Sequence, residues 1–260
     1  MRIFILGDLE GAAGVVDFHQ QTYSDARYYD QAKRLSTLEV NALVDGTLEG
    51  GAQEVWFLDG HGPGGIDYEL MHAEVQMIIG RPISAPWGLD KSFDAFFLYG
   101  HHSMGNTERG VLCHSWSSRA IANCWLNGEL IGEIGFNAAM AGSFGIPTVF
   151  ISGDDTAIAE TQQYVPNIVS VMTKQGLSQT SALSLAPAKA RELLQAGGKT
   201  AMEKIGEIDP FTIDPPYEFI TEMREEKAVD AKAKRSDVER LDAHRYKIVG
   251  DTLIEIAHRR

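Results

Sequence analysis

Near the start of the chain, a short apolar run leads directly into two acids: RIFILGDLEG, residues 2–11. Residues Ile3–Leu6 predict a buried strand that ends at Gly7. Asp8 and Glu10 follow two residues apart, and positions i and i+2 of an extended chain project to the same side. Two carboxylates held close together are unfavourable unless a cation or a proton lies between them. The run therefore predicts a strand that delivers an acidic pair, with a solvated strand end as the alternative.

The same pattern, an apolar run followed by polar residues, recurs along the first half of the chain. Val55–Leu58 precedes a glycine-rich loop that contains His61, and Phe93–Tyr99 precedes His101-His102. Helical stretches over about residues 25–49 and 133–144 separate these runs, and a fourth strand over 147–151 leads into Gly153-Asp154-Asp155. Strands that alternate with helices indicate an α/β fold, with a mostly parallel sheet covered by helices on both faces. In such sheets, sites form beyond the carboxyl ends of the strands.

The rest of the chain predicts a smaller C-terminal α+β region. Within the first half, Asn127-Gly128 indicates a hairpin between strands at 122–126 and 129–131. Further strands are expected at 168–173, 217–223 and 245–249, with a helix from Pro187 and a short one in the last ten residues. Residues 224–240, dense in charge, indicate a solvated helix face. We therefore expect a metal-site core over 1–155 and a second region over 156–260 that contributes to core packing and oligomerisation.

Composition excludes several classes of protein. The 260 residues are 44% hydrophobic and 23% charged, which excludes disorder of the whole chain. A formal net charge of -13 repels phosphate backbones, so we expect no nucleic-acid partner. No apolar run approaches the roughly 18 residues that a membrane span needs. The start of the chain has no leader pattern, and two cysteines, Cys113 and Cys124, cannot form a disulfide framework, so we expect the reducing cytoplasm.

The polar residues that follow the strands form a candidate ligand set. Its members are Asp8, Glu10, His61, Glu133 and one of His101 and His102. Individually, a loop histidine is often merely exposed, and a glutamate in a first helical turn serves the helix dipole. Together, mixed carboxylate and imidazole ligands suit Zn²⁺ or Mn²⁺, and five ligands fit a two-metal site with a bridging carboxylate better than one tetrahedral zinc.

Other catalytic motifs are absent or weak. The sequence has no H-E-x-x-H helix, no G-x-S-x-G elbow and no P-loop. His114 lies in a strand-like run over 110–116, where a buried histidine with a satisfied hydrogen bond is the simplest interpretation. The candidate ligands therefore remain the strongest indication of chemistry.

A series of short motifs, each weak alone but specific in this order, extends over about the first 155 residues. They are Gly7-Asp8-Leu9-Glu10-Gly11, Asp59-Gly60-His61, Gly100-His101-His102, Gly110–Ser115, Gly132–Gly135 with Asn137, and Ser152–Asp155. A weaker match continues through residues 184–190 and 238–242. On these residues the chain resembles the zinc-dependent D-aminopeptidases encoded with dipeptide transport systems.

The resemblance implies a site and an assembly. Two zinc ions per subunit would be held by Asp8, Glu10, His61, His102 and Glu133, which selects His102 over His101. His114 would be catalytic, as a nucleophile or as a general base. Members of this family have an α/β core with a second, smaller region, and form a homodecamer of stacked rings around an access channel that limits entry to short peptides.

We therefore expect a cytoplasmic dinuclear zinc aminopeptidase that releases N-terminal residues, D-residues in particular, from short peptides. Two alternatives use the same side chains. One is another metal-dependent amidase or phosphoesterase, and the other is a non-enzymatic metal-binding module. A complete ligand set accompanied by His114 argues against the module.

Overall fold

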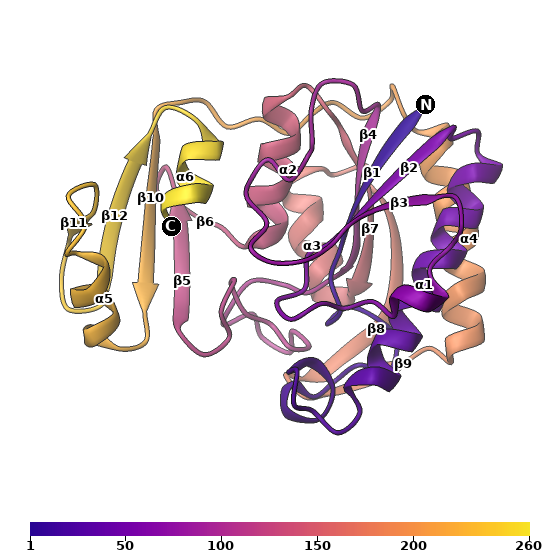
Figure 1. Ribbon diagram of the computed structural model, residues 1–260, viewed down its shortest axis with the longest axis horizontal. Helices are drawn as coiled ribbons and strands as arrows, with labels where there is room; N and C mark the ends of the chain where they lie inside the picture. Colours follow the sequence, from indigo (N-terminus) through magenta and orange to yellow (C-terminus); the bar gives the residue numbers. More distant parts are fainter.

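Short apolar strands form a seven-stranded sheet in the order β3-β2-β1-β4-β7-β8-β9 (Figure 1). The computed structural model describes residues 1–260. Neighbouring strands are parallel, except that β9 runs antiparallel to β8. The strands are β1 (Arg2–Gly7), β2 (Glu54–Asp59), β3 (Val75–Ile78), β4 (Ala95–His101), β7 (Thr148–Asp154), β8 (Val169–Ser178) and β9 (Ser181–Ser184). Every residue of β4 and β7 is buried, as expected for parallel strands covered on both faces.

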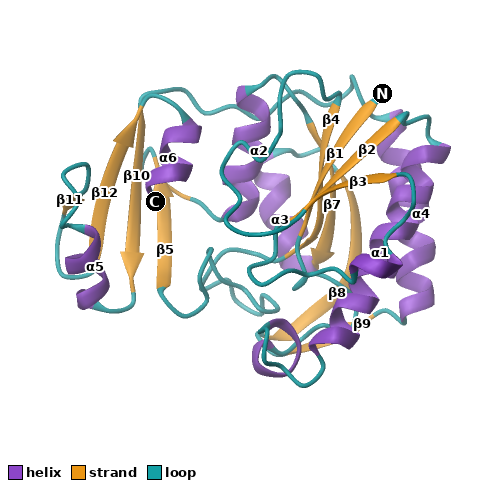
Figure 2. Ribbon diagram, viewed as in Figure 1, coloured by secondary structure: helices purple, strands orange, loops and turns teal.

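Helices cover both faces of this sheet, which confirms the predicted fold class (Figures 1 and 2). α1 (Tyr29–Glu49) and α4 (Pro187–Glu203) pack together on one face, and α2 (Glu133–Ser143) and α3 (Asp155–Tyr164) lie on the other. The helix boundaries follow local chemistry. α1 ends just before Gly50-Gly51, and the Asp154 side chain accepts a hydrogen bond from the Ala157 amide at the start of α3. None of the helices combines the length and the apolar character that a membrane crossing needs.

A second sheet of five antiparallel strands lies beyond α2, in the order β11-β12-β10-β5-β6. Its strands are β5 (Ile121–Leu126), β6 (Glu129–Leu130), β10 (Tyr217–Met223), β11 (Glu239–Arg240) and β12 (Arg245–Gly250). Two short helices, α5 (Glu226–Lys232) and α6 (Leu253–Arg259), pack on it. β5 and β6 form the hairpin predicted from Asn127-Gly128, whose φ angles of 52° and 87° suit a two-residue turn.

The two sheets do not divide the chain at residue 155. β5 and β6 join the second sheet although they precede that residue, and β8, β9 and α4 belong to the large sheet although they follow it. The reason is hydrogen bonding, because β8 pairs with β7 and β10 pairs with β5. Val171 of β8 and Leu194 of α4 lie in the apolar core of the large sheet.

Several local predictions need correction. The prediction of a strand over residues 110–116 is wrong, because these residues form an irregular loop of turns and bends. The solvated helix predicted over 224–240 is confined to α5. Four further elements were not predicted: the edge strands β3 and β9, a π turn over Phe18–Thr22, and a short 3-10 turn over Tyr68–Leu70.

The register of the large sheet determines where the polar segments meet. Gly7, the last residue of β1, pairs with Asp59 at the end of β2 and with Tyr99 near the end of β4. The residues that follow Gly7, Asp59 and Tyr99 therefore leave the sheet at the same edge. This confirms the prediction that the polar residues gather beyond the carboxyl ends of the strands.

Candidate metal centre

Asp8, Glu10 and His61 meet at the carboxyl edge of the large sheet. The His61 Nδ1 atom lies 3.1 Å from Asp8 Oδ1 and 3.0 Å from Glu10 Oε2. One potential ligand atom from each residue falls within 4.8 Å of the others, and all three side chains are nearly enclosed. They form the first of two groups that could hold a metal ion.

The second group contains His102, His114 and Glu133, again with potential ligand atoms within 4.8 Å of one another. Glu133 is the first residue of α2 and lies 3.7 Å, through Oε1, from the His102 Nε2 atom. Asp8, a member of the first group, also faces the second. Its Oδ1 atom faces His61, and its Oδ2 atom lies 3.3 Å from His102 Nε2. This is the arrangement of a carboxylate that can bridge two metal ions.

Backbone carbonyls orient both imidazole rings. The His61 Nε2 atom lies 2.8 Å from the Thr22 carbonyl oxygen, and the His102 Nδ1 atom lies 3.0 Å from that of Ser103. When these nitrogens donate, the other nitrogen of each ring is left with a lone pair toward the carboxylates, as in histidines that bind metals. His102 Nε2 is buried and makes no hydrogen bond. A buried nitrogen without a partner, surrounded by carboxylates, fits a metal ligand.

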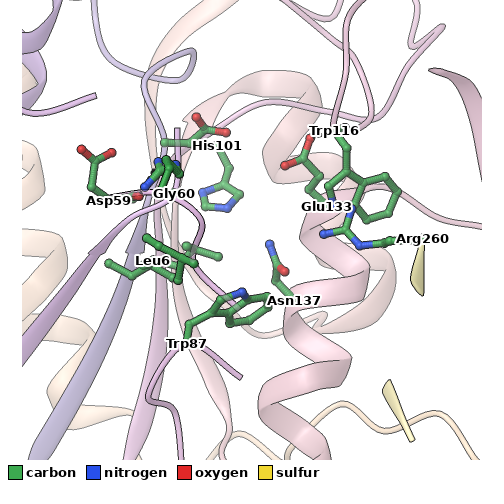
Figure 3. A pocket seen from close by; sticks show the side chains of 14 residues that line it. Leu6, Asp59, Gly60, Trp87, His101, Trp116, Glu133, Asn137 and Arg260 are labelled. Carbon is green, nitrogen blue, oxygen red and sulfur yellow. Dashed lines mark hydrogen bonds between the residues drawn. The ribbon is translucent and has the colours of Figure 1, made fainter. Parts of the chain in front are cut away.

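His101 lies outside both groups. It is the last residue of β4, and its Nδ1 atom lies 3.1 Å from the Tyr99 carbonyl oxygen. Its ring lines the adjoining pocket instead (Figure 3). Reasoning from residue types alone left open which of the two adjacent histidines enters the ligand set, and the geometry favours His102.

The electrostatics of the site favour positive charge between the acids. Burial opposes ionisation of Asp8, but the close imidazoles of His102 and His61 outweigh it and hold the pKa of Asp8 well below its ordinary value. Burial likewise opposes protonation of His61, and the charges of Glu10 and Asp8 raise its pKa well above the ordinary value. The side chains would therefore stabilise a cation at this place.

Lys174 holds in place the backbone that carries the first ligand group. Its Nζ atom donates to the carbonyl oxygens of Glu10, Ala12 and Val15, and its side chain is almost completely buried. These bonds fix the backbone that carries Glu10. Sequence reasoning missed Lys174, because nothing in the sequence of β8 distinguishes an inward-pointing lysine from a solvated one.

His114 packs flat against His102, with ring centroids 3.9 Å apart and planes inclined by 17°. Its Nδ1 atom lies 2.8 Å from the Leu112 carbonyl oxygen, so Nδ1 is the nitrogen that donates and Nε2 keeps its lone pair. Burial first, and then the charge of His102, lower the pKa of His114. The ring is therefore neutral at pH 7 and suited to accept a proton.

A pocket of about 190 Å³ opens beside the two groups (Figure 3). Asp8 and Glu133 contribute to its wall, together with His101, Trp87, Asn137, Trp116 and Arg260. Sequence reasoning did not find Arg260 or Trp87, since each reaches the pocket through tertiary packing alone.

Buried carboxylates and imidazoles at the edge of a parallel sheet, with a neutral histidine and a pocket beside them, define a hydrolase of the metal-dependent type. The family model described as D-aminopeptidase matches residues 1–259, and the chain belongs to this peptidase family. Membership favours peptide hydrolysis over the phosphoesterase and the non-enzymatic module considered above.

The chain is similar to a known protein sequence and to a solved structure, both from Bacillus subtilis. A D-aminopeptidase of Bacillus subtilis (strain 168) is 30% identical over 221 residues, which is 83% of this chain and 78% of that protein. The solved structure of the Zn-dependent D-aminopeptidase DppA from Bacillus subtilis, described as a self-compartmentalizing protease, superposes with a TM-score of 0.94 at 25% identity. That match covers 100% of this chain and 95% of the other.

Proposed function

We propose that the protein is a dinuclear zinc aminopeptidase that removes N-terminal D-amino acids from short peptides. The observation that carries the proposal is the pair of ligand groups on either side of Asp8. A single metal ion would use only one of these groups. The zinc dependence of the similar structure and the D-aminopeptidase description of the family support the choice of metal and substrate.

In this proposal, Asp8, Glu10 and His61 would hold one zinc ion, and His102 and Glu133 would hold the other with the help of Asp8. Zinc supplies Lewis-acid activation of a water molecule and of the scissile carbonyl. Three carboxylates leave two divalent ions with a net charge of about +1, which sustains that activation near neutral pH.

The proposed role of His114 is to carry a proton during hydrolysis of the peptide bond. Its neutral Nε2 atom can accept a proton from the attacking water and return it to the leaving amine, while the Leu112 carbonyl keeps the ring in the required tautomer. The stack on His102 fixes the ring beside the second ligand group. This role as a general base requires only one lone pair, which the observed orientation provides.

We also propose a self-associating, cytoplasmic protein, with the homodecamer of the resembling family as the expected assembly. The self-compartmentalizing character of the similar structure supports an oligomer. On the hairpin of β8 and β9, Leu177 and Leu183 are 60% and 67% exposed, and β9 is an edge strand that a second copy can contact. In this proposal the region after residue 155 supplies subunit contacts.

Metal analysis combined with a peptide assay tests the proposal. After zinc reconstitution and desalting, we expect two equivalents of zinc per chain and faster hydrolysis of D-Ala-D-Ala than of L-Ala-L-Ala. Glu133→Gln should lower the zinc content toward one equivalent and abolish turnover. Glu129→Gln, a change of the same chemistry at an exposed position of β6, serves as the control. One equivalent in the wild-type protein, or no peptide hydrolysis, contradicts the proposal.

A further inference from the structure

Arg260, which follows α6, extends its side chain into the wall of the pocket beside the metal centre (Figure 3). Aromatic rings hold the guanidinium group. Its central carbon lies 4.2 Å from the centroid of the Trp116 ring and 5.4 Å from that of Phe136. The Trp116 amide donates to Glu133 Oε1 at 2.6 Å, so the platform under the guanidinium is attached to a candidate metal ligand.

The guanidinium of Arg260 shares the pocket with Glu133 but makes no ion pair with it or with any other acid of the chain. Neither an ion pair nor a side-chain hydrogen bond forms there, and the Nε atom is buried without an acceptor. Two arginines nearby behave differently, since Arg235 and Arg259 both pair with Asp237 at 2.7 Å. Arg260 as a whole is partly exposed, but a cation whose enclosed nitrogen lacks an acceptor is costly unless a counter-charge reaches it.

The acids of the pocket are already engaged. Asp8 and Glu133 belong to the candidate metal centre, and Asp59 accepts a hydrogen bond from the Gly65 amide. A second cavity behind Arg260 is mostly apolar, and its only other charged group is Lys232, which is also a cation. A molecule that enters the pocket is therefore free to supply the acceptor.

We propose that Arg260 binds the free α-carboxylate of the peptide substrate. This inference rests on the proposed function. A guanidinium matches a carboxylate through two parallel hydrogen bonds, and aromatic stacking fixes the plane in which those bonds form. In a short peptide the carboxylate lies one or two residues from the scissile bond, at roughly 3.3–3.6 Å per residue. A cation next to Glu133 can therefore select short substrates by their free end.

Paired substrates test the inference. We compare kcat/KM for D-Ala-D-Ala and for its C-terminal amide, in wild-type enzyme and in Arg260→Met. The wild-type enzyme should prefer the free carboxylate by about 10- to 100-fold, the usual effect of a charge-assisted hydrogen bond. Arg260→Met should remove this preference by slowing only the carboxylate substrate, and Arg260→Lys should restore part of it. Arg224→Met, at an exposed arginine, is the control.

The outcomes separate the inference from the proposed function. If Arg260→Met slows both substrates equally or lowers the zinc content, the residue has a structural role and the inference is wrong. Equal use of both substrates by the wild-type enzyme also overturns it, while leaving the aminopeptidase proposal intact. Failure of the wild-type enzyme to hydrolyse any peptide contradicts the proposed function, and the inference falls with it.

Discussion

At the scale of single residues, His114 can be separated from the metal ligands by experiment. Its ring belongs to the second ligand group by distance, yet its stacking on His102 and its neutral state suit a proton carrier. We expect His114→Ala to lower kcat by roughly 10²- to 10⁴-fold, the usual contribution of a general base, with two zinc equivalents retained. The exposed His244→Ala variant is the control. Loss of one zinc equivalent in His114→Ala would make His114 a ligand.

A second residue, Glu39, makes stability depend on pH. Burial raises the pKa of Glu39 to about 7, although its carboxylate accepts hydrogen bonds from Tyr99 and from the Ala13 amide. A raised pKa in the folded state gives stability that is complete below pH 4.5 and is lost as the pH rises through 7. We expect Glu39→Gln to gain stability over the wild type by up to about 3 kcal/mol between pH 5 and pH 8, measured by urea unfolding. A difference that does not vary with pH contradicts this.

Some residues of the candidate site are recognisable from the sequence, and others are not. Asp8, Glu10 and His61 could be found because each directly follows a recognisable strand. The choice between His101 and His102 could not be made from residue types, since adjacent side chains of a strand point to opposite faces and the chain itself does not say which face is the site. Lys174 and Arg260 gave no local signal, because their roles arise only when distant elements pack.

At the scale of elements, the strands buried on both faces were predictable and the edge strands were not. β1, β2, β4 and β7 are continuous apolar runs with polar residues after them. β3 and β9 are four residues long and only half buried, so their sequences resemble loops. Likewise, the segment around His114 has the composition of a strand, yet it is irregular and brings the ring beside His102.

The contact between α1 and α4 depends on glycine. A Cβ atom at Gly46 of α1 would overlap the Gln195 carbonyl oxygen of α4, and one at Gly198 would lie 2.6 Å from the Leu43 carbonyl oxygen. Helix propensity favours alanine over glycine by about 1 kcal/mol, but backbone atoms cannot yield as a flexible side chain does. We therefore expect Gly46→Ala to destabilise the protein by about 1–3 kcal/mol in urea unfolding.

The control for this substitution is Arg34→Ala, at an exposed position of the same helix, which should change stability by less than about 0.5 kcal/mol. A Gly46→Ala variant as stable as the wild type would mean that α4 can move away from α1 without loss. That result would remove the close helix contact as a determinant of the fold.

At the scale of the whole molecule, α2 joins the two halves. Ile134 and Ala141 pack in the core of the large sheet, whereas Phe136 and Met140 of the same helix pack in the core of the second sheet. Glu133 begins this helix, so the candidate metal centre lies where the two cores meet. A division of the chain by sequence position could not reveal this, because strands from both halves of the chain contribute to each sheet.

At the scale of the whole molecule, the exposed leucines of the β8–β9 hairpin predict which surface forms the contact between subunits. β9 is an edge strand, and Leu183 on it is 67% exposed, so this edge offers both open hydrogen-bonding groups and apolar surface to a second copy. Each chain also carries a net charge of -13, so a carboxylate added at a contact would meet strong repulsion.

We expect light scattering to show a multiple of 28.5 kDa for the wild type and a smaller species for Leu183→Asp. Circular dichroism should stay unchanged, because an exposed side chain adds little to the fold. Leu241→Asp, at an exposed leucine beside the second sheet, should keep the wild-type mass. A monomeric wild type, or a Leu183→Asp variant of undiminished mass, would show that this edge does not join the subunits.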